Sequence, residues 1–207
     1  MKIVVTSDTH EQEPELPGGD LLIHAGDWSG CGNKNDTLKF IEWMKRIKPQ
    51  FKHGIVVVPG NHELYVANRE IEIRNKFRDI GVNFLVNKHT VIEGVCIYGT
   101  PHSLPFFNWA YMASEQQCQN TYKRIRLDTQ IIVSHGPAKG LLDWVPRGEN
   151  VGSQALLDAI DRVKPKYCFV GHIHEMYGHV THGPTEYYNV AHGYSSDRRH
   201  PPAVVEI

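Results

Sequence analysis

Residues that can bind metal ions follow five apolar, strand-like runs of this 207-residue chain. Each run ends in carboxylate, amide or imidazole side chains, which are common ligands of divalent metals. In chain order these residues are Asp8 and His10, Asp27, Asn61 and His62, His135, and His172 and His174. Each residue alone also fits an ordinary turn or surface role. Because every one of these strand ends carries ligand-type residues, together they predict a metal centre.

The stretch 56–63, Val-Val-Val-Pro-Gly-Asn-His-Glu, illustrates how the chain would deliver these groups. Its β-branched start predicts a buried strand, and Pro-Gly marks the point where that strand stops. In open α/β sheets, ligands bind at the carboxyl ends of the strands. Taken by itself, the Gly-Asn-His-Glu segment fits a polar loop with a capping Asn. Because the other strand ends also carry ligand-type residues, we favour a role in metal binding or catalysis for this segment.

Two strand ends carry a pair of candidate ligands separated by one residue. Side chains two positions apart on an extended chain point to the same side. Asp8 and His10 could therefore face one ion together, and so could His172 and His174, with Ile173 facing away. An isolated Asp8-Thr9-His10 triplet would fit a turn aspartate and a solvated histidine equally well.

The number and charge of the candidate ligands predict two metal ions and an anionic substrate. Two carboxylates, one amide and five histidines exceed what one ion coordinates. Two ions about 3.5–4 Å apart, bridged by a carboxylate, would use such a set. Asp8 and Asp27 would neutralise only part of the metal charge, so the site would favour phosphate. Mixed oxygen and imidazole ligands suit Mn, Fe, Ni or Zn better than calcium.

The elements that must position these residues follow from the hydrophobic pattern. Strands that lead to candidate ligands are expected over 2–7, 20–25, 56–58, 130–134 and 167–170. Helices are expected over 36–48, capped by Asp36, and over 67–79, 114–127 and 153–163, the last capped by Ser153. Short strands over 82–86, 90–93 and 95–99 suggest a meander, and 177–182, 185–190 and 203–206 complete the strands. His24, inside a strand, is expected to be a hydrogen-bonded core residue.

Composition favours a packed globular domain over 1–207, with 41% hydrophobic and 22% charged residues. A net charge of -1 gives no bulk signal for nucleic-acid or membrane binding. The four cysteines form no C-x-x-C pair, and Cys31 reads as a surface thiol rather than a neighbour of the metal. The first residues enter a strand instead of a signal peptide, which points to the cytoplasm.

Two loops carry open alternatives. The segment 100–111 contains Phe106, Phe107, Trp109 and Tyr111. A loop packed on the core is the preferred interpretation, and a wall for a flat substrate group is the alternative. The segment 139–152 is a candidate lid or pocket edge, in which Arg147 could meet an anion or remain a solvated surface residue.

The order Asp-x-His, Gly-Asp, Gly-Asn-His-Glu, His-Gly and Gly-His-x-His resembles the calcineurin-like metallophosphoesterase superfamily over residues 3 to about 192. The blocks 22–27, 60–63, 135–137 and 171–175 resemble its small metallophosphoesterase-domain subgroup, similar to class III cyclic nucleotide phosphodiesterases. The resemblance implies an α/β fold of four layers: an αββα sandwich of two mixed sheets flanked by helices.

The resemblance also implies roles for the candidate residues. One ion would be held by Asp8, His10 and His174. The other would be held by Asn61, His135 and His172. Asp27 would bridge the two ions, which are expected to be manganese, with Fe, Ni, Zn or Mg as alternatives. His62 would not be a ligand but would protonate the leaving oxygen or stabilise the transition state, and Glu63 would orient His62.

The expected reaction is in-line attack of a metal-bound hydroxide on phosphorus, assisted by His62. The resemblance favours small phosphodiesters, including cyclic nucleotides, with a base stacked near Phe106, Phe107 and Trp109. The alternatives are a phosphomonoesterase acting on nucleotides or proteins, a nuclease, and a non-catalytic metal-binding scaffold. A nuclease would need a basic groove, which the balanced charge does not support.

Overall fold

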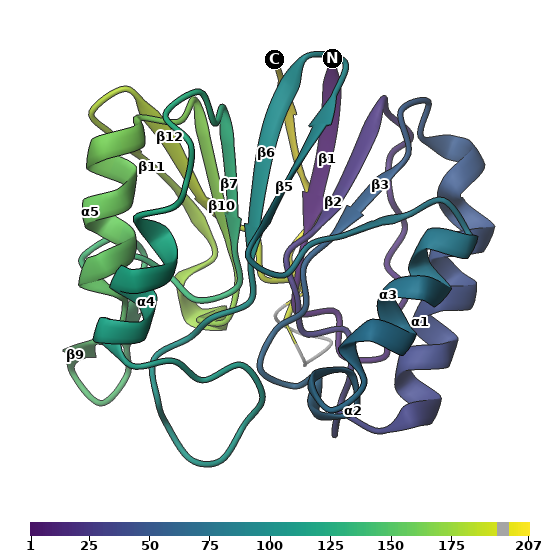
Figure 1. Ribbon diagram of the computed structural model, residues 1–207, viewed down its shortest axis with the longest axis horizontal. Coiled ribbons are helices and arrows are strands. Elements are labelled where there is room, and N and C mark those ends of the chain that lie inside the picture. Colours follow the sequence, from purple (N-terminus) through teal and green to yellow (C-terminus); the bar gives the residue numbers. More distant parts are fainter. Residues whose placement is uncertain (194–198) are drawn as a thin grey trace.

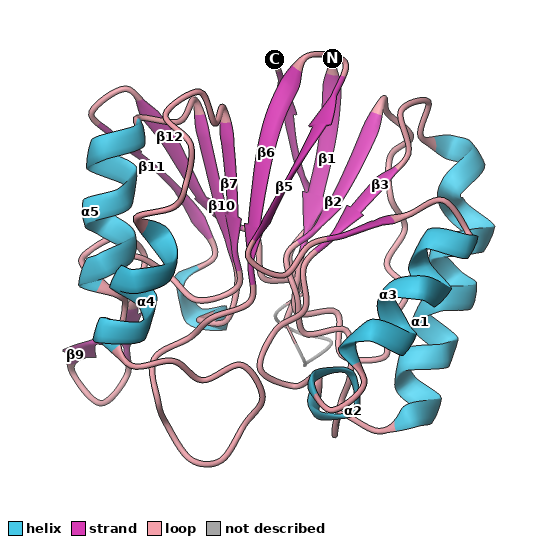
Figure 2. Ribbon diagram, viewed as in Figure 1, coloured by secondary structure: helices cyan, strands magenta, loops and turns pink. Residues whose placement is uncertain are grey.

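The computed structural model describes residues 1–193 and 199–207 and contains two β-sheets packed face to face (Figures 1 and 2). The first sheet has the order β13 (Ala203–Glu206), β1 (Lys2–Thr6), β2 (Leu21–His24), β3 (Ile55–Val57) and β4 (Asn83–Phe84). The second has the order β11 (Gly178–His182), β12 (Thr185–Asn189), β10 (Tyr167–Val170), β7 (Ile131–Ser134), β6 (Val95–Thr100) and β5 (Lys88–Ile92).

Helices cover the outer face of each sheet (Figure 1). α1 (Lys34–Ile47), α2 (Leu64–Ala67) and α3 (Glu70–Asp79) lie on the side of the first sheet, and α4 (Glu115–Tyr122) and α5 (Gln154–Val163) cover the second. Short 3-10 helices occupy Lys48–Gln50 and His174–Met176. The four-layer αββα sandwich expected from the sequence is confirmed.

Three apolar clusters fill the spaces between the layers. The cluster between the sheets includes Val5 and Ile23 from the first sheet and Val133 and Phe169 from the second. The neighbouring residue Val4 belongs to a different cluster, between the first sheet and its helices. Successive side chains of a strand point to opposite faces, so these strands are buried on both sides. This accounts for their continuous apolar runs.

The central strands of both sheets run parallel to one another. β1 pairs with β2, β2 with β3 and β3 with β4 in parallel, and so do β6 with β7, β7 with β10 and β10 with β12. Their carboxyl ends therefore meet on one side of the molecule, which lies at the bottom of Figure 1. The ligand-type residues identified in the sequence follow these ends.

The structure corrects several predicted boundaries. Asn33, not Asp36, is the N-cap of α1, because its side chain accepts a hydrogen bond from the backbone N–H of Asp36 in the first turn. The helix predicted over 67–79 corresponds to α3, which begins at Glu70, and the short α2, which ends at Ala67, was not predicted. α4 ends at Tyr122, earlier than predicted, whereas Ser153 caps α5 as expected.

The predicted meander over 82–99 is also corrected. β4 pairs in parallel with β3 in the first sheet, whereas β5 and β6 form an antiparallel hairpin in the second. The segment 139–152 is not entirely a loop, since it contains a small hairpin of β8 (Trp144–Val145) and β9 (Glu149–Asn150). No helix in the described part of the chain is long and apolar enough to cross a membrane.

Candidate metal centre

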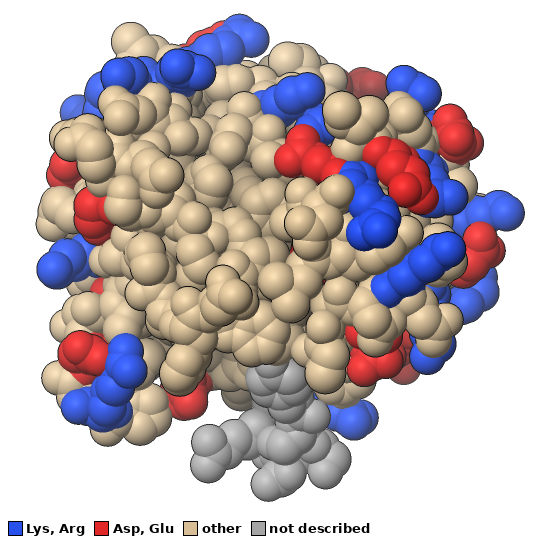
Figure 3. Space-filling model, turned by 60° about the horizontal axis from the view of Figure 1, so that its bottom comes forward, with Lys and Arg blue, Asp and Glu red and all other residues tan. Residues whose placement is uncertain are grey.

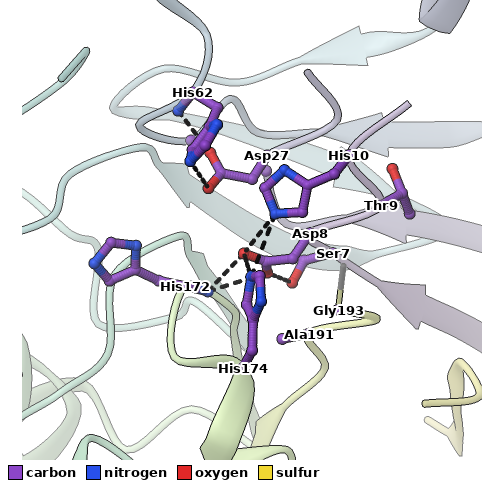
Figure 4. A network of polar contacts seen from close by, with 12 residues as sticks. Ser7, Asp8, Thr9, His10, Asp27, His62, His172, His174, Ala191 and Gly193 are labelled. Carbon is purple, nitrogen blue, oxygen red and sulfur yellow. Dashed lines mark hydrogen bonds and ion pairs between the residues drawn. The ribbon is translucent and has the colours of Figure 1, made fainter. Parts of the chain in front are cut away.

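The eight predicted ligand-type residues come from both sheets and gather at the seam between them. Three of their segments follow strands of the first sheet, β1, β2 and β3, and two follow strands of the second, β7 and β10. Figure 4 shows the polar contacts among those that follow β1, β2, β3 and β10. Seven of the predicted residues form three groups, which are linked because His10 and Asp27 each belong to two of them.

The first group is Asp8, His10 and His174, whose potential ligand atoms all lie within 4.8 Å of one another. Nε2 of His174 is 3.1 Å from Oδ1 of Asp8 and 3.3 Å from Nε2 of His10. Ligands about 2 Å from a shared ion are themselves separated by roughly 3 Å, so this spacing fits one metal ion.

The second group contains Asp27, His135 and His172, again with ligand atoms within 4.8 Å. Nε2 of His135 lies 3.2 Å from Oδ2 of Asp27 and 2.9 Å from Oδ1 of Asn61. The amide oxygen of Asn61 therefore joins this group as a fourth potential ligand.

Asp27 connects this second group to a third, which consists of His10, Asp27 and His62. Nε2 of His62 is 3.9 Å from Oδ2 of Asp27, and the backbone N–H of His62 donates to Oδ1 of Asp27 at 2.8 Å. The carboxylate of Asp27 thus lies between His135 and His62. His62 therefore lies at the edge of the same cluster, and these distances alone do not distinguish a metal ligand from a proton donor.

Three imidazoles are oriented by backbone carbonyl groups. Nδ1–H of His10 donates to Ser29 O at 3.0 Å, that of His62 to Gly30 O at 2.6 Å, and that of His135 to Ala25 O at 3.0 Å. A carbonyl oxygen only accepts, so each ring carries its proton on Nδ1 and directs Nε2 into the cluster. Such a partner on the second ring nitrogen is typical of metal-binding histidines.

The backbone reaches these positions through left-handed conformations rather than an extended chain. φ is +53° at Asp8, +42° at His10, +54° at Asp27 and +70° at His172. The extended chain predicted at Asp8 and His10 is therefore wrong, although the potential ligand atoms of the two side chains do lie within 4.8 Å of each other. Left-handed backbone is uncommon for residues other than glycine, and it concentrates at functional sites.

The buried carboxylates are held in their charged form by the imidazoles. Burial alone would raise the pKa of Asp8, but the hydrogen bond and charge of His174 lower it well below its usual range. Burial would likewise raise the pKa of Asp27, which His135 lowers. Burial lowers the pKa of His10 and of His172 to about 4. Ionised carboxylates and neutral imidazoles are the forms that coordinate metals.

His135 differs from these two imidazoles. Burial alone would lower its pKa, but the charges of Asp27 and Asp8 and the hydrogen bonds to Asp27 and Ala25 raise it to about 9. Its ring is completely buried beside the Asp27 carboxylate. A positive charge is therefore favoured at the His135 ring. A metal ion bound to His135 would replace the ring proton that faces Asp27.

Glu63 holds together the loops that carry Asp27 and Asn61. Its carboxylate accepts hydrogen bonds from the backbone N–H groups of Asp27, Ser29 and Gly60, at 2.9, 3.0 and 2.6 Å. Burial and the charge of Asp27 raise the pKa of Glu63 to about 8, against the opposing effect of these N–H groups. Its side chain thus stabilises the backbone on which the predicted ligands stand.

Glycines leave space for the side chains of the centre. A Cβ at Gly60 would overlap the carboxylate of Asp27 and the ring of His135, and a Cβ at Gly171 would overlap Ser7 and Asp8. His24 is fully buried, as expected for a hydrogen-bonded core residue. Its Nδ1 accepts from the backbone N–H of Gly26, and its Nε2–H donates to Thr9 Oγ1.

The aromatic stretch lies beside the centre, and its residues occupy different places. The ring of Trp109 stacks on His62 with a centroid distance of 4.3 Å and an interplanar angle of 21°. The ring of Phe106 lies 5.1 Å from that of His172. Phe107 is 91% exposed. The sequence favoured a loop packed on the core, with an aromatic wall as the alternative. Neither interpretation predicted these pairings, because they depend on how a loop without regular structure returns to the strand ends.

The donor set fits divalent transition metals. It combines carboxylate and amide oxygens with imidazole nitrogens, which is the mixture that Mn, Fe, Ni and Zn accept. The side chains are largely buried, which reduces competition from water. Asp27 is shared by two of the three groups, as a bridging carboxylate would be.

The sequence matches the calcineurin-like phosphoesterase family over residues 1–176. It is similar to a UPF0046 protein of Caenorhabditis elegans, with 34% identity over 92% of this chain and 69% of the worm protein. It is also similar to metallophosphoesterase domain-containing protein 1 of Homo sapiens, with 32% identity over 92% of this chain and 65% of the human protein. This chain therefore spans about two thirds of the length of these relatives.

Solved structures share the fold. One superposes with a TM-score of 0.62 and 16% identity, over 91% of this chain and 89% of its own. The NAD nucleotidase of Haemophilus influenzae superposes with a TM-score of 0.51 and 12% identity, over all of this chain and 49% of the nucleotidase. At such identities the similarity concerns the fold alone.

Proposed function

This chain belongs to the calcineurin-like phosphoesterase family, and from that premise we propose that it is a phosphodiesterase dependent on two divalent metal ions. The observation that carries this proposal is the position of Asp27, whose carboxylate lies within 4.8 Å of ligand atoms of His10 on one side and of His135 and His172 on the other. Manganese is the metal we propose, because the oxygen and imidazole ligands suit it.

The proposed ligands follow the geometric groups. One ion would be held by Asp8, His10 and His174. The other would be held by Asn61, His135 and His172. Asp27 would bridge the two ions. When bound, the ions would supply an activated water molecule and neutralise the charge of the phosphoryl oxygens.

His62 is proposed to be the proton donor to the leaving group. Water adds to phosphorus while the bond between phosphorus and the alcohol oxygen breaks, and that oxygen must receive a proton as it leaves. Nδ1–H of His62 is engaged by Gly30 O, so the proton would be delivered through Nε2. The stack with Trp109 and the short bond to Gly30 restrict the orientation of the ring.

Glu63 is proposed to be a positioning residue rather than one that meets the substrate. It is completely buried, and its carboxyl group accepts hydrogen bonds from the backbone N–H groups of Asp27, Ser29 and Gly60. The orientation of His62 would follow from the loop that Glu63 holds, because His62 is the preceding residue and its own N–H donates to Asp27.

Small phosphodiesters, including cyclic nucleotides, are the proposed substrates. Phe106, Phe107 and Trp109 offer ring surfaces beside the centre on which a base could stack. Figure 3 shows the face at the strand ends, where uncharged residues predominate and Lys and Arg lie mainly around the margin. A nuclease would need basic residues along a groove, so a small substrate is favoured.

The proposed compartment is the reducing cytoplasm. The four cysteines are free thiols, of which Cys96, Cys118 and Cys168 are buried and Cys31 is exposed. Oxidising compartments favour disulfides, so free thiols fit a reducing one.

Initial rates on bis(p-nitrophenyl) phosphate and p-nitrophenyl phosphate, measured side by side with added Mn²⁺, test the proposal. A higher kcat/KM for the diester supports a phosphodiesterase. A preference for the monoester would favour a phosphatase acting on nucleotides or proteins. Bound metal without turnover of either ester would favour a non-catalytic scaffold.

A further inference from the structure

A pocket of about 600 Å³ opens beside His172. Its apolar lining includes Leu104, Pro105, Phe106, Pro137, Val145 and Val151, and we call it the His172 pocket. The volume lies within the range of small-molecule sites, which are concave and mostly apolar. The pocket is continuous with the centre, because His172 itself lines it.

A second hollow, of about 430 Å³, is lined by Cys31, Leu64, Phe107, Asn108 and Trp109. We call it the Trp109 hollow. Trp109 stacks on His62, so this hollow borders the proposed proton donor. The chain between Pro105 and Trp109 separates the two spaces, since Phe106 lines the first and Phe107 lines the second.

The two spaces adjoin different parts of the centre. His172 belongs to the ligand group of Asp27 and His135, whereas His62 belongs to the group of His10 and Asp27. In Figure 4 the rings of His62 and His172 lie apart from each other, and each has a ligand atom within 4.8 Å of the Asp27 carboxylate. A phosphoryl group at the centre would therefore have one space on its His62 side and the other on its His172 side.

On the premise of the proposed function, we infer that the His172 pocket binds the ester group that stays on phosphorus, while the leaving alcohol departs past His62 and the Trp109 hollow. The alcohol must lie next to its proton donor, which assigns it to the His62 side. A phosphodiester has one further organic group, and the pocket on the other side is the space that can hold it. A phosphomonoester lacks this group.

The chemistry of the lining selects an uncharged, flat ester group. Phe106 offers a ring face, and the prolines and valines offer apolar walls. Arg147 also lines the pocket, but it forms an ion pair with Glu149, which lines it too. The carboxylate of Glu149 neutralises the positive charge of Arg147 at this wall. The pocket therefore does not favour an ester group that carries a negative charge of its own, in addition to the phosphate. The substrate class is therefore a phosphodiester whose retained ester is an aromatic or similarly flat group.

Three substrates with the same leaving group isolate this effect. They are phenyl p-nitrophenyl phosphate, methyl p-nitrophenyl phosphate and p-nitrophenyl phosphate, each assayed with added Mn²⁺. We expect kcat/KM for the phenyl ester to exceed that for the methyl ester by roughly 10- to 100-fold, as burial of a phenyl ring in an apolar pocket predicts. Equal values for the two diesters would overturn the inference.

Two variants with matched controls locate the effect in the pocket. Val145→Trp fills the pocket and should reduce the phenyl-to-methyl ratio at least fivefold, whereas Val204→Trp, at an exposed position of β13, should not. Phe106→Ala removes the ring face and should lower the same ratio. Phe107→Ala should leave it unchanged, because Phe107 lines the side of the common leaving group. An unchanged ratio in Val145→Trp and in Phe106→Ala would contradict the assignment.

Equilibrium binding separates failure of this inference from failure of the proposed function. With Mn²⁺ present, calorimetry should show tighter binding of diphenyl phosphate than of dimethyl phosphate, roughly tenfold or more, and Val145→Trp should abolish the difference. Absence of turnover with this binding difference would reject the proposed hydrolase but support the pocket. Turnover of both diesters without any difference in rate or binding would reject the pocket and retain the hydrolase.

Discussion

Oδ2 of Asp27 lies 3.2 Å from Nε2 of His135, although the two residues follow strands of different sheets. Asp27 follows β2 in the first sheet, and His135 follows β7 in the second. Both side chains are buried, and a hydrogen bond between His135 and Asn61 spans the same seam. The centre therefore depends on how the two sheets pack, and a change at Asp27 acts on residues from both.

Asp27→Ala is expected to lose bound metal. The substitution removes the carboxylate shared by two ligand groups. It also removes the negative charge that raises the pKa of His135. Metal content after dialysis against Mn²⁺ should fall from two ions per chain to one or none. Asp128→Ala, at an exposed Asp paired with Arg126, is the matched control and should keep full occupancy. Full occupancy with full activity in Asp27→Ala would exclude a bridging role.

His62→Ala is expected to lower kcat by roughly 10²- to 10⁴-fold, as loss of a general acid does, while metal content is retained. The proposed ligands Asp8, Asn61 and His135 remain in place in this variant. Parallel measurement of bound Mn²⁺ and of kcat on diphenyl phosphate, whose phenoxide leaving group needs a proton more than p-nitrophenoxide does, separates the two possible roles. His182→Ala, whose ring pairs with Asp161 at the surface, is the control. Loss of metal from His62→Ala would make His62 a ligand.

The positions of the ligand-type residues were predictable because each directly follows a short apolar run. His135 after Ile131–Ser134 and His172 after Tyr167–Val170 are examples. A strand buried on both faces is evident from its composition, and parallel strands bring their ends together. The four-layer arrangement was predicted from the resemblance to the metallophosphoesterase superfamily. The hydrophobic periodicity alone predicted only the strands and helices and not how they pack.

Other features depend on tertiary contacts that no local pattern carries. The sequence predicted that Asn83 and Phe84 belong to a meander. Two residues are too few to show that they pair with β3, which lies on the other side of a helix in the chain. The left-handed backbone at Asp8 is not indicated by its residue type. The stack of Trp109 on His62 joins a loop to a strand end 47 positions earlier, and sequence indicated only that aromatic residues were present.

Glu63→Gln is expected to lower the free energy of unfolding by about 1–3 kcal/mol, the cost of leaving a buried polar group unpaired. The carboxyl group accepts from three backbone N–H groups through both of its oxygens. The NH₂ group of Gln cannot accept, so one N–H would face another donor. Urea denaturation at pH 5 with a chelator measures the change without a contribution from metal. At this pH the pKa of Glu63, raised to about 8 by burial, keeps the group uncharged in the folded protein, so Glu and Gln are compared without a buried charge.

Glu72→Gln is the matched control for this substitution, because Glu72 is exposed and forms only an i,i+4 pair with Lys76. Its unfolding free energy should change by no more than about 0.5 kcal/mol. An equally small change in Glu63→Gln would mean that the three backbone bonds contribute little to the stability of the loops. In that case the positioning role proposed for Glu63 would be wrong.

The stability of the metal-free protein is expected to fall as the pH decreases below 6.5, partly because of His24. Burial lowers the pKa of His24 to about 3 from an ordinary value of 6.5. The backbone N–H of Gly26 donates to Nδ1, so protonation of that nitrogen would break this hydrogen bond. The unfolded chain therefore binds this proton more readily, and the stabilisation present above pH 6.5 is lost as the pH falls toward 3.

Between pH 7.5 and pH 5 the contribution of His24 amounts to about 2 kcal/mol of unfolding free energy. His10 and His172, which are also buried with lowered pKa values, add to the total, so the comparison must be made between variants. His24→Gln can still donate and accept but does not titrate, and its loss of stability between these pH values should be smaller by about 2 kcal/mol. His182→Gln, at the surface, should lose as much as the unsubstituted protein. Denaturant titrations with a chelator at both pH values measure these losses. If the unsubstituted protein, His24→Gln and His182→Gln lost equal amounts of stability, His24 would be protonated in the folded protein at pH 5.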